Sequence, residues 1–190
     1  MNEPVKHLMI DIETLGTSGG AKILSVAATP FSNPWGVTIE KHEPFYEKIN
    51  SKSYALNEGW YEDEGTVEWW AGQSEDARSE AFSGTREPES VMVELAAFIT
   101  ELNPATVWAK GFMDTTMLEW AFKKYGIKTP WHYRAPRCLR TVLKTFGSEL
   151  DCGSHYLNEA GHVPHNPVHD NDYQIAQLEE LFTYTRLVLE

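Results

Sequence analysis

Residues 6–17 read KHLMIDIETLGT, and this stretch decides which fold the chain adopts. It begins with a short apolar run that has acidic residues at its end, which predicts a central β-strand over 6–12. Asp11 and Glu13 are two positions apart, so on a strand their carboxylates project from the same face. Such a pair can hold a cation, although an isolated Asp-x-Glu is also common where a strand merely enters a loop. Gly16 follows in a turn-rich segment, where backbone can approach a ligand closely.

The rest of the chain predicts strands first and strand–helix units later. This order is typical of a mixed α/β fold, with an antiparallel meander followed by βα units in one central sheet flanked by helices. Apolar runs predict further strands over 22–31, 37–46 and 105–109. Helical periodicity predicts helices over 87–102, about 114–125 and about 170–189, and a basic strand-to-helix segment over 134–146. Short helices are expected within the polar segment 50–84, with Thr66 as an N-cap.

The composition predicts one globular domain over residues 1–190. The chain is 42% hydrophobic, and 16 Lys and Arg against 28 Asp and Glu give a formal charge of −12, which excludes a coat held on nucleic acid by charge alone. No apolar run approaches the roughly 20 residues of a membrane span, and the first residues lack a secretion-signal pattern. We therefore expect a cytoplasmic protein without membrane contact. Cys138 and Cys152 are too few for a disulfide framework and are expected as free thiols.

Two further acidic residues stand where the predicted helices begin. Asp114 follows the strand over 105–109, and Asp170 heads the last helix; either can be an ordinary helix cap. His165 lies five residues before Asp170 in a loop that contains proline, where an imidazole can serve as a general base. Only the fold can bring these residues to Asp11 and Glu13.

Three motifs together resemble those of the DEDDh 3′-5′ exonuclease superfamily. They are MIDIETLGT over 9–17, Asp114 after WAKG over 108–111, and HNPVHD over 165–170, in that order. Further segments resemble a bacterial and phage subfamily of 3′-5′ exoribonuclease-like proteins, namely VEWW over 67–70 with Gln73-Ser74, Pro130-Trp131 and Arg140-Thr141. This resemblance spans nearly the whole chain.

The resemblance implies an RNase H-like fold and two-metal hydrolysis of single-stranded RNA or DNA from the 3′ end, with release of nucleoside 5′-monophosphates. It also implies a ligand set for two Mg²⁺ or Mn²⁺ ions and a general base, His165; the ligands are Asp11, Glu13, Asp114 and Asp170. Oxygen-only ligands independently suit these hard cations.

The third motif departs from the usual pattern at three positions, since Pro167, His169 and Asn171 replace more common residues of the superfamily. Pro167 restricts Asn166 and stiffens the loop, which puts the loop geometry in question more than the identity of the catalytic residues. Asp172 is a rival fourth ligand, but it is seven positions from His165, whereas the family spacing of five fits Asp170.

Substrate contacts are expected from the loop after the first strand and from aromatic and basic side chains. Adjacent tryptophans on a helix point about 100° apart, so one should pack and one should reach the rim. The sequence favours neither, and we take Trp70 as the rim residue. Arg134, Arg137 and Arg140 are further candidates for phosphate contacts. The expected substrate-binding residues are Thr14, Leu15, Gly16, Trp69, Trp70 and Lys110.

Several readings stay open at the level of the sequence. A phosphodiesterase of the same fold that trims short oligonucleotides tolerates the acidic charge better, and a catalytically silent binding module can keep the fold. A zinc site built from Cys152, His155, His162 and His165 is a weak alternative, because one thiolate and scattered histidines rarely hold structural zinc. The choice between RNA and DNA and the presence of a homo-oligomer are left open.

Overall fold

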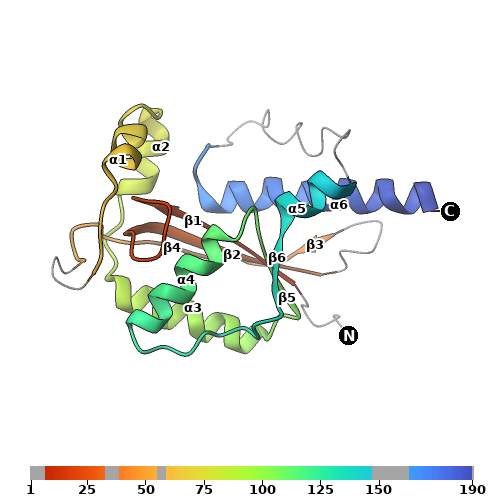
Figure 1. Ribbon diagram of the computed structural model, residues 1–190, viewed down its shortest axis with the longest axis horizontal. Coiled ribbons are helices and arrows are strands. Elements are labelled where there is room, and N and C mark those ends of the chain that lie inside the picture. Colours follow the sequence, from red (N-terminus) through yellow and green to blue (C-terminus); the bar gives the residue numbers. More distant parts are fainter. Residues whose placement is uncertain (1–6, 33–38, 55–58, 147–162, 190) are drawn as a thin grey trace.

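A computed structural model describes residues 7–32, 39–54, 59–146 and 163–189 of the chain. Its centre is a six-stranded sheet in the order β3-β2-β1-β5-β6, with β4 also pairing with β2 (Figure 1). The strands are β1 (His7–Thr14), β2 (Ile23–Ser32), β3 (Glu40–Lys41), β4 (Phe45–Lys48), β5 (Thr106–Ala109) and β6 (Pro136–Cys138).

The strand directions confirm the predicted mixed sheet. β1 pairs antiparallel with β2, and β2 pairs antiparallel with both β3 and β4. On its other side β1 pairs parallel with β5, which pairs parallel with β6. The strand expected over 37–46 is instead two short strands, because Pro44 lies between them and lacks the N–H that a continuous ladder needs.

Six helices accompany the sheet in the described residues: α1 (Glu64–Ala71), α2 (Glu75–Phe82), α3 (Pro88–Leu102), α4 (Met113–Lys124), α5 (Leu139–Phe146) and α6 (Pro167–Leu189). The expected N-cap at Thr66 is wrong. Asp63 caps α1, because its carboxylate precedes the first turn, and its Oδ1 accepts the backbone N–H of Thr66, three residues later, at 2.9 Å. Among the described residues, no helix is long and apolar enough to cross a membrane.

The two faces of the sheet are covered differently (Figure 1). α3 and α4 cover one face, and α6 runs across the other, with α5 beside it. Side chains of β1 alternate between them: Leu8 and Ile10 belong to the cluster that contains the apolar side of α3, whereas Met9 packs with Ile175 and Leu178 of α6. The alternation places Asp11 and Glu13 on the α6 face, where β1 ends.

Candidate active site

The first two acidic residues of the site come from the end of β1. Its pairing with β2 shifts register between Glu13 and Thr14, and such an irregularity increases local twist and re-aims the side chains beside it. Thr14 then turns the chain by donating its hydroxyl to the carbonyl of Gly16 at 2.6 Å. Asp11 and Glu13 thus lie at the end of a central strand whose neighbours on both sides are paired.

The third acidic residue comes from the first turn of α4. Asp114 does not cap this helix, because Phe112 occupies the N-cap position and makes no side-chain cap hydrogen bond. Instead the Oδ1 atom of Asp114 accepts the backbone N–H of Ile12 at 3.4 Å. Asp114 is 5% exposed. This contact ties α4 directly to the segment of β1 between Asp11 and Glu13.

The third motif forms the start of α6. Asn166 precedes the helix and accepts the N–H groups of Val168 and His169 through its side-chain oxygen, at 2.9 and 3.3 Å. Pro167 is the first helical residue, a position where its missing N–H costs nothing. His165 has a φ of 62°, a left-handed conformation that is uncommon for residues other than glycine.

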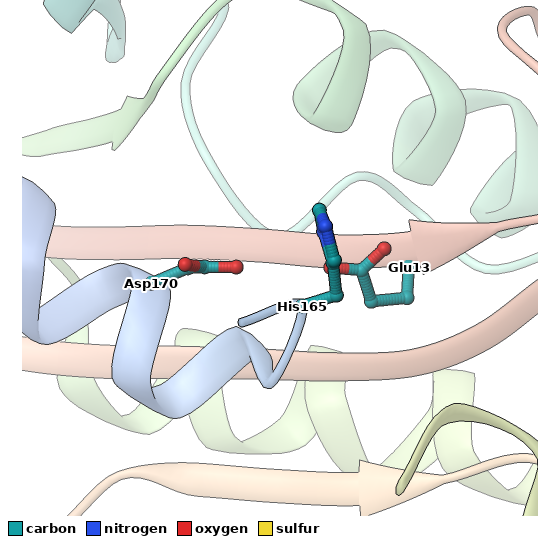
Figure 2. Close-up of side chains that lie close together, drawn as sticks. All are labelled: Glu13, His165 and Asp170. Atoms are coloured by element: carbon teal, nitrogen blue, oxygen red, sulfur yellow. The ribbon is translucent and has the colours of Figure 1, made fainter. Parts of the chain in front are cut away.

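These segments meet in one cavity of about 490 Å³. Figure 2 shows His165 and Asp170, from the start of α6, close to Glu13 of β1. Ligand atoms of these three residues all lie within 4.8 Å of one another, and the Nδ1 atom of His165 is 3.6 Å from the Oε1 atom of Glu13. The polar residues that line the cavity are Asp11, Glu13, Lys110, Asp114, Arg140, His165, Asp170, Tyr173 and Gln174.

Burial of the carboxylates, together with repulsion among them, raises their pKa values. Burial, followed by repulsion from Asp114, Glu13 and Asp170, raises the pKa of Asp11 well above its usual value. Burial likewise raises the pKa of Glu13 to about 7, against the opposing effect of His165. Burial raises the pKa of Asp114 to about 6. Raised pKa values mean that the charged forms of these carboxylates are disfavoured when no cation is near. Such a cluster is typical of a site that binds a cation.

His165 is poised between the carboxylates and two aromatic rings. The nearby carboxylate of Glu13 raises the pKa of its imidazole, while burial acts in the opposite direction. The rings of Trp69 and Trp70 meet the imidazole edge-on, with centroids 4.8 and 5.7 Å away. The side chain is 32% exposed, so it reaches both the carboxylates and solvent.

The structure reverses the expected order of the two tryptophans. Trp70 is 1% exposed, packs with Leu15 and Leu24, and donates its indole N–H to the carbonyl of Thr14 at 2.9 Å. The assignment of Trp70 to the rim is therefore wrong, because α1 turns this residue toward the sheet. Trp69, its neighbour, is 46% exposed beside His165.

The remaining residues expected to contact substrate differ in their accessibility. Leu15 is 3% exposed and packs in the small cluster with Trp70. Gly16 packs closely, since a Cβ there would lie 2.8 Å from the Cβ of Ala21. Lys110 lines the cavity. Residues 14–16 thus pack beside the cavity and support it, whereas Lys110 lines the cavity itself.

Sequence reasoning missed the polar residues that fix the carboxylates. Gln174, one turn after Asp170, donates from Nε2 to the Oδ1 atom of Asp11 at 2.9 Å. Glu80 of α2 accepts a hydrogen bond from Asn166 at 3.0 Å and further bonds from Tyr46 and Lys48. Gln174 is four residues after Asp170, so the two lie on the same face of a helix, and this spacing could have identified Gln174 from the sequence. No local pattern points to Glu80.

Asp172 lies outside the cavity lining. It pairs with Lys41 of β3 at 2.7 Å. Asn171, 0% exposed, donates to the hydroxyl of Thr29 at 3.2 Å, so its polar side chain helps to dock α6 on β2. Asp170 lines the cavity, as the expected spacing from His165 requires. Cys152, His155 and His162, which the zinc alternative needs, lie outside the described residues.

The donor set fits divalent cations. Four carboxylates share the cavity, and hard cations such as Mg²⁺ and Mn²⁺ prefer such oxygen ligands. Gln174 provides a second indication of a cation site. Its Oε1 atom is buried without a hydrogen-bond partner among the described residues. Water molecules held by a cation beside Asp11 would provide the missing donor.

Comparisons with known proteins agree with this geometry. Residues 6–182 match the sequence model of the Rv2179c-like 3′-5′ exoribonuclease domain. No curated protein sequence matches the chain. Among solved structures, E. coli exonuclease I in complex with a dT13 oligonucleotide is similar, with a TM-score of 0.67 and 13% identity over 96% of this chain.

Two further structures of exonuclease I match equally well. The zinc-bound E. coli complex with single-stranded DNA has a TM-score of 0.65 and 14% identity over 96% of this chain, and another exonuclease I structure has 0.65 and 16% over 94%. At such identities the likeness establishes a shared fold. The chain spans 42–43% of the length of these three structures.

Proposed function

The chain belongs to the family of Rv2179c-like 3′-5′ exoribonuclease domains, and from this premise we propose that it is a metal-dependent 3′-5′ exonuclease of single-stranded nucleic acid. The observation that carries the proposal is the meeting of four carboxylates and His165 in one cavity, from β1, α4 and the start of α6. A hydrolase that cuts phosphodiesters needs this combination of cation ligands and a titratable base.

The carboxylates serve as ligands for two Mg²⁺ or Mn²⁺ ions. Asp11 is close enough to Asp114, Glu13 and Asp170 for their charges to raise its pKa, so it would hold cations together with them. When bound, such cations neutralise charge on the phosphate and lower the pKa of water. Gln174 orients Asp11 through its hydrogen bond, which leaves the second carboxylate oxygen of Asp11 available.

His165 is the general base in this proposal. Its neutral imidazole takes a proton from the attacking water as the water oxygen bonds to phosphorus. The bond from phosphorus to the 3′-oxygen of the preceding nucleotide then breaks, and that oxygen takes a proton from solvent water. Glu13 orients the imidazole and stabilises its protonated form, as the raised pKa of His165 indicates.

The terminal nucleotide of the substrate lies against Trp69. This indole is exposed next to His165, and base–aromatic stacking tolerates any sequence. A single-stranded 3′ end is favoured because a paired end must first unstack. The DNA-bound exonuclease I structures support a single-stranded substrate, and the family description supports RNA.

The net charge of −12 favours a second candidate, a phosphodiesterase that prefers very short oligonucleotides. An extended strand requires many phosphate contacts, whereas a short one relies on the cations. Initial rates on strands of graded length separate the two, because an exonuclease of long strands keeps its rate as length increases.

The test of the proposal uses linear RNA and DNA strands labelled at either end, with Mg²⁺, with Mn²⁺ or with chelator. We expect mononucleotide release from the 3′ label first, a ladder from the 5′ label, and no reaction in chelator. Hydrolysis that persists in chelator contradicts the metal-dependent reaction. Rapid cutting of circular strands contradicts action from an end.

A further inference from the structure

Two basic residues stand side by side at the edge of the sheet next to the site. β5 and β6 are parallel, with Ala109 opposite Cys138, and Lys110 and Arg140 come just after these two strand ends. The backbone N–H of Arg140 donates to the carbonyl of Lys110 at 3.0 Å. The carboxyl ends of parallel strands commonly carry the ligand-binding residues of a sheet.

Both side chains are held toward the cavity. The ammonium of Lys110 donates to the Oε1 atom of Gln177 at 2.6 Å and lies 5.0 Å from the ring centroid of Tyr173. Arg140 reaches back over Gly111, where a Cβ would lie 3.7 Å from its Nη1 atom. Both line the same cavity as the four carboxylates.

Lys110 and Arg140 are two like charges held close together beside the cavity. Lys22, Lys41, Lys48 and Arg86 each form a salt bridge with a carboxylate. Neither Lys110 nor Arg140 forms one within the parts of the chain that the structure describes. Burial and then the nearby charge of Arg140 lower the pKa of Lys110, against the opposing effect of Asp170 and Asp11. In a chain with 28 acidic residues, this arrangement favours an anion from outside.

We propose that Lys110 and Arg140 form a second phosphate subsite, which binds the phosphodiester one nucleotide to the 5′ side of the bond that is cut. This inference rests on the proposed function. Lysine provides a point charge and arginine a fork of donors, which together suit the two free oxygens of a phosphodiester.

The direction of the strand follows from the positions of the helices. α1, which carries Trp69, and α5, which carries Arg140, lie on opposite sides of the first turns of α6 (Figure 1). With the terminal nucleoside against Trp69, the preceding nucleotide extends toward α5. Phe112, 57% exposed at the cavity, offers an apolar surface for its base.

The test replaces one charge on the substrate and one on the protein. Three single strands are compared: an unmodified strand, one with a neutral methylphosphonate at the linkage next to the scissile bond, and one with the same group five linkages upstream. The initial rate of release of the first nucleotide is measured for the wild type and for Arg140→Gln, Lys110→Gln and Lys144→Gln. Lys144 is an exposed residue of α5 outside the cavity, so its variant is matched in charge and helix.

We expect the methylphosphonate next to the scissile bond to slow the wild type and Lys144→Gln by about tenfold or more, the scale of a lost charge-assisted contact. In Arg140→Gln and Lys110→Gln this ratio should fall toward one, because the contact is already missing. Equal rates on the three strands in the wild type, or an unchanged ratio in both cavity variants, would overturn the subsite while leaving the exonuclease intact. Failure to degrade the unmodified strand would instead refute the proposed function, and with it the subsite.

Discussion

The two faces of the central sheet are built on different principles. On the α3 and α4 face, the residues facing the sheet are apolar and buried, such as Val91, Leu95 and Ile99. On the α6 face, apolar packing by Ile175 and Leu178 alternates with polar contacts. The α3 and α4 face buries mainly apolar side chains. The α6 face buries fewer of them, because polar and charged side chains take their place.

The α6 face contains buried polar atoms that lower the stability of the fold. Asn171 bonds to Thr29 and Gln174 to Asp11, yet each amide keeps a buried oxygen without a partner among the described residues. Buried polar atoms without partners reduce the free energy of unfolding, whereas apolar residues there would raise it. The apolar α3 and α4 face thus secures the fold, and the α6 face carries the chemistry together with Asp114 from the first turn of α4.

The largest expected effect is on the α6 face. Asp11→Asn should lower turnover by about 10³-fold or more, because loss of a shared ligand removes several kcal/mol of transition-state stabilisation. Steady-state kinetics in Mn²⁺ measure this effect. Asp172→Asn makes the same chemical change outside the cavity and should keep turnover within about twofold, as expected for a surface pair. Similar losses in both variants would contradict the assignment of the site.

On the other face, Leu95→Ala should lower the free energy of unfolding by about 2–5 kcal/mol, because it leaves a cavity at a fully buried position. Urea unfolding measures this change. Turnover at a temperature well below the melting point should stay close to that of the wild type. Val93→Ala, at an exposed position of the same helix, should change stability by about 0.5 kcal/mol at most. A large loss of turnover in folded Leu95→Ala would show that the two faces are not independent.

His165→Ala should lower kcat by about 10²-fold or more, the usual contribution of a general base, and leave most of the metal-induced stabilisation intact. Rate assays and thermal melting of the same sample separate the two effects. His132→Ala, an exposed histidine outside the cavity, is the matched control. Loss of metal binding without loss of kcat at saturating metal would make His165 a ligand and not a base.

The smallest expected effect on the kinetics concerns Trp69, and its neighbour Trp70 provides the comparison. Trp69→Ala should raise KM by about tenfold with little change in kcat, because stacking of one base contributes roughly 1–3 kcal/mol. Trp70→Ala should instead reduce stability by about 3–5 kcal/mol, since this indole is buried and bonded to Thr14. An increase in KM for Trp70→Ala alone, with stability unchanged, would restore the order expected from the sequence.

The fold was predictable where periodicity is strong. The apolar run of β1 and the apolar stripe of α3 identified both elements within two residues. The start of α6 was missed by three residues, because Asn166 and Pro167 read as loop although they cap and open a helix. The break at Pro44 was also missed, since the run around it alternates as a strand does.

The three motifs, taken in their order along the chain, were enough to predict the acidic residues of the site and His165. The supporting contacts were not, because Gln174 meets Asp11 across 163 positions and Asn166 meets Glu80 across 86. Such contacts depend on how helices dock on the sheet. The choice between Trp69 and Trp70 failed for a related reason: adjacent residues have the same local signal, and only the orientation of α1 distinguishes them.

The most direct test of this account is the melting temperature in Mn²⁺ and in chelator, measured at pH 5 and pH 8. The account predicts that Mn²⁺ raises the melting temperature because cations relieve the crowding of carboxylates. The rise should be larger at pH 8, where Glu13, with a pKa of about 7, and Asp114, with a pKa of about 6, have lost the protons that compete with metal. Asp11→Asn should lose most of the rise. Equal melting temperatures in Mn²⁺ and chelator, or the same rise in Asp11→Asn, would contradict a cation site on this face of the sheet.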